Sequence, residues 1–80
     1  MTQRPQRLAL KFLLARLLDQ LETGLGEQDV DAVWADDMSA FCFVYRGKVS
    51  LWHPIDPQII KWANRCADDT MRNLVCGRMQ

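Results

Sequence analysis

The sequence is poor in the residues that crosslink a small protein or hold a metal. It has three cysteines and one histidine among 80 residues. Cys42, Cys66 and Cys76 are an odd number, and none belongs to a CxxC pair. This pattern argues against a disulfide framework and favours a reducing compartment, which we expect to be the cytoplasm. A zinc site needs three or more protein ligands at short spacing, so we expect neither a metal nor another cofactor.

The sequence also lacks the motifs of the common catalytic sites. No Gly-rich phosphate loop, GxSxG or HExxH is present. The acidic pairs at 36–37 and 68–69 would diverge by about 100° on a helix, whereas acid–base catalysis needs carboxyls that converge. His53 could face Cys42 across a hairpin, but a structural histidine at a strand end is far commoner than a Cys–His pair. We therefore expect no enzyme.

Neither charge is in excess, because ten basic side chains balance ten acidic ones. A dedicated nucleic-acid-binding domain normally carries a clear positive excess. No apolar run reaches about 18 residues, so we expect no membrane span. The stretch 8–18 follows basic residues, but Lys11 and Arg16 interrupt it and no A-x-A cleavage site follows. A mitochondrial presequence is a minor alternative, since the first 18 residues are basic, acid-free and amphipathic.

Repeats, low-complexity segments and long linkers are absent, so residues 1–80 are expected to form a single small domain. A domain of this size buries only about 60% of the surface that its unfolded chain exposes. Such a chain usually needs a disulfide, a metal, or a partner for reinforcement. With the first two disfavoured, a partner protein or a second copy is the expected reinforcement.

The first strong pattern is an amphipathic helix over residues 5–23, with Pro5 in its first turn and Gly24 just past its end. Six leucines share an arc of about 140°: Leu10, Leu13, Leu14, Leu17, Leu18 and Leu21. Leu8 and Phe12 lie apart from this stripe and form a second apolar patch. Basic residues also crowd the positive end of the helix dipole. Either these charges are placed by accident, or the basic end meets an acidic partner.

The acidic segment Glu27–Asp37 follows, and its periodicity fits two structures. As a helix it gathers Val30, Val33 and Trp34 on one side, with acids in its first turn. As a strand it places Val30, Ala32 and Trp34 on one face and Asp29, Asp31 and Val33 on the other. The acids slightly favour a short helix.

A β-hairpin is predicted over Ala40–Trp52, because apolar residues fill both faces of its first strand. A turn at Gly47-Lys48 would place glycine first. In this register Phe43 pairs with Trp52, and Cys42 lies opposite His53.

The last helix is expected to begin with Asp56 as N-cap and Pro57 at its first position, and to end at Gly77. The middle of its apolar face is small and suits the leucines of the first helix, so the helices should pack on each other or on one face of the hairpin. The fold class is therefore α+β: an N-terminal amphipathic helix, an acidic segment, a hairpin and a C-terminal amphipathic helix.

These features favour a small protein-binding modulator, an adaptor or inhibitor of a larger protein, of the kind typical of bacterial and phage accessory genes. A homodimer is a further expectation. The alternative is a small nucleic-acid-associated regulator that uses its basic N-terminal arm and the basic surface of the hairpin and the last helix. The predicted contact residues are aromatic, leucine or basic side chains on three segments: Arg4, Arg7, Leu8, Lys11, Phe12, Arg46, Lys48, Lys61, Trp62 and Arg65.

Overall fold

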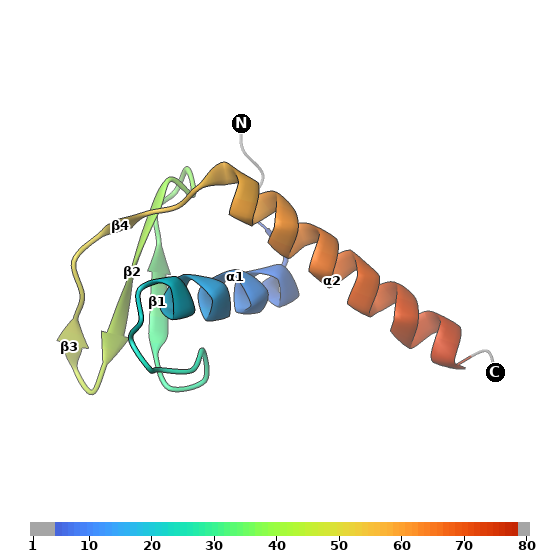
Figure 1. The fold of residues 1–80 in the computed structure, drawn as a ribbon, viewed down its shortest axis with the longest axis horizontal. Helices are drawn as coiled ribbons and strands as arrows, with labels where there is room; N and C mark the ends of the chain where they lie inside the picture. Colours follow the sequence, from blue (N-terminus) through green and yellow to red (C-terminus); the bar gives the residue numbers. More distant parts are fainter. Residues whose placement is uncertain (1–4, 79–80) are drawn as a thin grey trace.

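The fold is α+β, with two helices on one side of a small antiparallel sheet. The computed structural model describes the backbone of residues 5–78 and the side chains of residues 5–74. Figure 1 shows the sheet at one end of the molecule, α1 beside it, and α2 running outward from it. Along the chain the elements are α1 (Arg7–Gln20), β1 (Asp31–Trp34), β2 (Ala40–Tyr45), β3 (Lys48–Val49), β4 (His53–Pro54) and α2 (Pro57–Arg78).

Helix α1 confirms the predicted leucine-rich helix but is shorter at both ends than 5–23. It ends in a hydrogen-bonded cap: the Thr23 N–H donates to the Leu18 carbonyl (3.2 Å) and the Glu22 N–H to the Asp19 carbonyl (3.0 Å). This pattern turns the chain through a residue in the left-handed conformation. Glu22 occupies that position with φ of 55°, before Gly24 with φ of 73°. The helix therefore stops before the predicted Thr23.

The acidic segment 27–37 contains a strand, so the preference for a short helix was wrong. β1 pairs antiparallel with β2, with Asp31 opposite Val44 and Trp34 opposite Phe41. The Trp34 and Phe41 rings stack with centroids 5.6 Å apart. Pairing with a neighbouring strand satisfies the backbone and gives Trp34 an aromatic partner, and this outweighs the weak preference for acids in a helical first turn.

The hairpin is present, but its predicted register was wrong. The turn is Arg46-Gly47, with φ of 51° and 78°, the two positive values that a tight hairpin turn requires. Val44 therefore pairs with Val49. Ser50 then lies opposite Phe43, donating its N–H to the Phe43 carbonyl (2.8 Å).

A β-bulge follows, in which Leu51 and Trp52 together oppose Cys42. It arises because Ser50 faces Phe43 while His53 faces Phe41, which leaves two residues against one. Phe43 is thus not paired with Trp52. His53 and Cys42 are not opposite each other, since neighbouring residues of a strand point to opposite faces.

Helix α2 begins as predicted. Asp56 caps it, its carboxylate accepting the Gln58 N–H at 2.9 Å, and Pro57 is the first residue. The predicted stop at Gly77 was wrong, because the helix continues to Arg78. A glycine costs a helix interior only about 1 kcal/mol, which need not end it.

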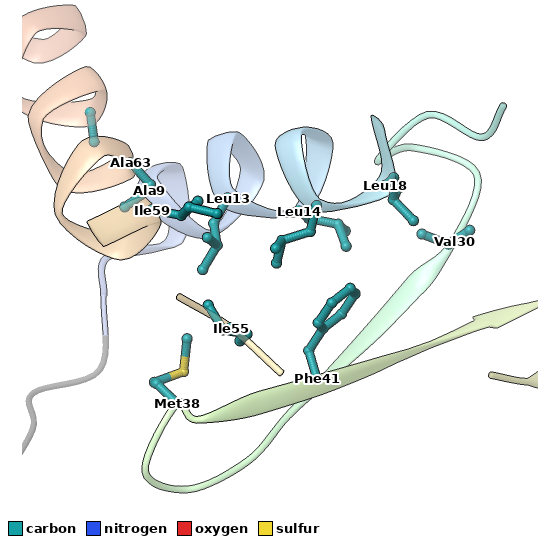
Figure 2. Packing of buried hydrophobic residues seen from close by; sticks show 12 residues of the cluster. Ala9, Leu13, Leu14, Leu18, Val30, Met38, Phe41, Ile55, Ile59 and Ala63 are labelled. Carbon is teal, nitrogen blue, oxygen red and sulfur yellow. The ribbon is translucent and has the colours of Figure 1, made fainter. Parts of the chain in front are cut away.

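One apolar core joins the helices to one face of the sheet. Figure 2 shows Phe41 pointing from β2 toward Leu14 and Leu18 of α1. The predicted contact between the leucines and the small face of α2 is confirmed, because Ala63 and Ala67 are buried in the same cluster. No buried polar or charged residue is found in the described part.

Candidate contact surfaces

The face of the sheet that points away from α1 is apolar and is covered by no helix. Alternation along the paired strands places Val33, Cys42, Val44 and Val49 on it. Figure 1 shows both helices on the other side of the sheet. The bulge residues Leu51 and Trp52 oppose Cys42, which lies on this face, and we therefore group them with it as the outer face. Its most exposed side chains have large accessible fractions: Val33 45%, Trp52 56%, Val49 67% and Leu51 82%.

The outer face carries little charge among the described strands. Asp31 is the charged residue on it, at the start of edge strand β1. Cys42 at its centre is buried, although it does not belong to the core cluster under the helices. The outer face therefore combines a closed centre with protruding apolar side chains. That is the composition expected of a contact patch rather than of a solvated surface.

A groove lies between α1 and β1. We call it the α1 groove; it is a hollow of about 390 Å³ that mixes apolar and charged side chains: Arg7, Leu10, Lys11, Leu14, Glu27, Gln28, Ala32 and Trp34. A second hollow of about 320 Å³ adjoins it and shares Lys11 and Glu27. The structure thus brings the predicted contact residues Arg7 and Lys11 together at one hollow. Arg4 lies outside the described residues.

The other predicted contact residues of α1 have a role in the fold. The ring of Phe12 packs edge-on against Trp62 of α2, with centroids 6.5 Å apart, and Leu8 is also partly buried against the core. Leu8 and Phe12 are therefore not the free apolar patch that the helical wheel indicated. Arg16, which the sequence reasoning missed, places its guanidinium carbon 4.6 Å from the Trp62 ring centroid. Its spacing of four residues from Phe12 was the signal available.

The remaining basic residues do not form one surface. Arg46 and Lys48 are exposed at the hairpin turn, where the Arg46 guanidinium carbon lies 5.2 Å from the Tyr45 ring centroid. Lys61 and Arg65 are exposed on α2. Figure 1 places the β2–β3 turn at one end of the molecule and α2 toward the other. These four predicted contact residues are therefore divided between two parts of the molecule.

The residues considered for chemistry have structural surroundings. The His53 ring lies nearly parallel to that of Phe43 (13°, centroids 6.2 Å apart) and also packs on Phe41. Cys42 lies on the opposite side of the sheet. Within residues 5–78, no three His, Cys, Asp or Glu side chains gather as metal ligands would. None of the described helices has the length and apolar character needed to cross a membrane.

The comparisons with known proteins return no relative. No protein-family model, curated protein or solved structure matches the chain. The surfaces themselves are thus the basis for a function.

Proposed function

We propose that this chain is a non-catalytic protein-binding modulator, an adaptor or inhibitor that docks on a larger protein. The observation that carries the proposal is the outer face, where Leu51 and Trp52 protrude beside exposed valines. The small size of the chain and the lack of catalytic motifs in its sequence fit a bacterial or phage accessory protein.

The energetics favour covering this face. Removing a large apolar side chain from water contributes about 1.5–3 kcal/mol, and tryptophan is among the commonest hot-spot residues of protein interfaces. Leu51 and Trp52 are adjacent, so one partner pocket could cover both. The β1 edge of the sheet is a poorer contact site, because β1 begins at Asp31 and is followed by Asp36 and Asp37, and charge on an edge opposes strand addition. We therefore assign docking to the face.

The nucleic-acid alternative gains no support from these surfaces. Its described basic residues are divided among α1, the hairpin turn and α2. Binding driven by phosphate contacts needs cations that follow one backbone. A salt-sensitive mobility shift with the purified chain would nevertheless favour that alternative over ours.

The test uses the full-length chain with an affinity tag, expressed in its native host. Leu51→Glu places a charge on the outer face, and we expect it to abolish capture of the partner. Leu74→Glu is the matched control: Leu74 is also an exposed leucine, at 60%, but it lies on the projecting part of α2. We expect this variant to capture as much partner as the wild type.

Light scattering on the purified chain distinguishes a partner protein from a second copy. A stable complex with a larger protein that Leu51→Glu disrupts supports the proposal. If the wild type is strictly monomeric and captures nothing, or if both glutamate variants behave alike, the proposal fails.

A further inference from the structure

The α1 groove has the composition of a site for an anion attached to an apolar group. Leu10 and Leu14 of α1 face Trp34 of β1 across it. Arg7 and Lys11 lie one helical turn apart along the same wall. Its volume of about 390 Å³ falls within the usual range of ligand pockets, which combine apolar walls with a few placed charges.

The helix itself adds to the positive charge of this wall. Arg7 is the first residue of α1, no acidic residue occupies the first turn, and Gln6 makes no side-chain capping bond. The positive end of the helix dipole is thus reinforced by cations instead of being compensated by an acid. This arrangement opposes helix stability, but it favours an anion placed at the groove.

One negative group already lines the groove. Glu27, from the loop that precedes β1, borders both hollows and shares them with Lys11. Its carboxylate would compete with an incoming anion for the same cations. Phosphate-rich ligands are disfavoured here, because Glu27 repels each of their negative charges and the leucine side chains offer them no hydrogen-bond donor. A single carboxylate beside an apolar side chain suits the groove better.

We propose that the α1 groove binds an acidic, apolar peptide segment of a partner protein. A leucine or phenylalanine of that segment packs against Leu10, Leu14 and Trp34, and a neighbouring carboxylate pairs with Arg7 and Lys11. This site is separate from the outer face and does not depend on it. A chain that uses both surfaces would join two protein segments, as an adaptor does.

The test titrates the full-length chain with an acetylated, amidated hexapeptide of alternating aspartate and leucine. Binding is followed by shifts of backbone amide NMR signals. We expect the largest shifts at residues 7–14 and 32–34. The same hexapeptide with asparagine in place of aspartate should bind at least fivefold more weakly, since it keeps the apolar contacts but loses the charge pairing.

Three variants separate the site from general attraction between charges. Removing both groove cations in R7Q/K11Q should raise the dissociation constant about tenfold. The matched variant R46Q/K48Q removes the same charge at the hairpin turn and should change it less than twofold. Glu27→Gln should lower the dissociation constant two- to fivefold, because it removes the competing carboxylate. All five substituted residues lie outside the buried core.

Several results would overturn the assignment. They are equal weakening by the two double variants, shifts concentrated at Leu51 and Trp52, no difference between the two hexapeptides, or no shifts at roughly millimolar peptide. Tighter binding of oligothymidylate at the same residues would show a nucleic-acid site instead. Failure of this proposal leaves the outer face untouched, because Leu51→Glu tests that surface alone.

Discussion

The two faces of the sheet are similar in composition and opposite in environment. Phe41 points to the inner face and is fully buried, whereas Val49 on the outer face is two-thirds exposed. Both faces consist mainly of apolar side chains. Burial in this domain is therefore decided by where the helices lie and not by the composition of the strands.

The size of the chain explains the difference. Residues 5–78 form two helices, which pack against each other as well as against the inner face, so no described element covers the outer one. Strands that are apolar on both faces are usually covered on both. Here the second cover is absent from the described chain, which is why we assign that face to a partner.

The largest expected effect is a difference in unfolding free energy between a variant of the inner face and a variant of the outer face. Phe41→Ala should lower the free energy of unfolding by about 3–5 kcal/mol, because it opens a cavity in the core cluster. Leu51→Ala should change it by less than about 0.5 kcal/mol, because Leu51 is mostly in water. Urea denaturation followed by circular dichroism measures both. Since small domains are only marginally stable, the Phe41 variant is expected to be largely unfolded at 37 °C.

An equal loss of unfolding free energy in Phe41→Ala and Leu51→Ala would contradict the difference between the two faces. It would show that the outer face is already covered in the isolated protein, for instance by self-association. Repeating the Leu51→Ala measurement over a range of protein concentrations identifies that case, because the stability of a dimer depends on concentration.

A smaller effect is expected at the closed centre of the outer face. Cys42→Ser should destabilise the fold by about 1–3 kcal/mol, because it buries a hydroxyl with no partner prepared for it. Cys66→Ser is the matched change at a half-buried position of α2 and should have little effect. Thermal unfolding of the two variants measures the difference. If Cys42→Ser is neutral, water reaches the centre of the outer face and the face is open throughout.

Much of the inner side could be predicted from the sequence. The leucine stripe of α1, the small face of α2 and the cap at Asp56-Pro57 depend on local periodicity and local chemistry. Strand β1 could not be chosen over a short helix from the sequence, because its pairing with β2 joins residues between 7 and 13 positions apart and overrides a local preference. The prediction of the hairpin register was wrong for two reasons. Arg46 is a non-glycine residue at positive φ, and the bulge leaves no sign in the periodicity of the sequence.

Among the candidate surfaces, too, some features could be predicted from the sequence and others could not. Arg7 and Lys11 were predicted from their position on one helix, and the structure brings them to the α1 groove. Phe12 and Trp62 were expected to be exposed, because a helical wheel shows one helix without its neighbour. The outer face was missed as a surface. Its signal was the doubly apolar strand β2 in a chain with too few helices to cover both sides.

The smallest expected effect lies in the turn between β1 and β2, which joins the edge strand of both faces to β2. The Asp37 carboxylate accepts hydrogen bonds from the Ser39 hydroxyl (2.6 Å) and the Ser39 N–H (3.0 Å). These bonds hold the pKa of Asp37 below its ordinary value of 3.8. Because the folded-state pKa is the lower one, the turn is stabilised above pH 3.8, and that stabilisation is lost as the pH falls through the folded-state value.

Ser39→Ala removes the shorter of the two bonds and should therefore make unfolding less dependent on pH below about pH 4. Acid titrations followed by tryptophan fluorescence measure this, with Asp36→Asn as the variant that removes a charge from the same turn without touching the Ser39 bonds. The change should be smaller than that of Cys42→Ser, because Asp37 is exposed and solvent screens it. An unchanged acid profile in Ser39→Ala would mean that the buried side chain of Met38, and not the polar bonds beside it, holds the turn.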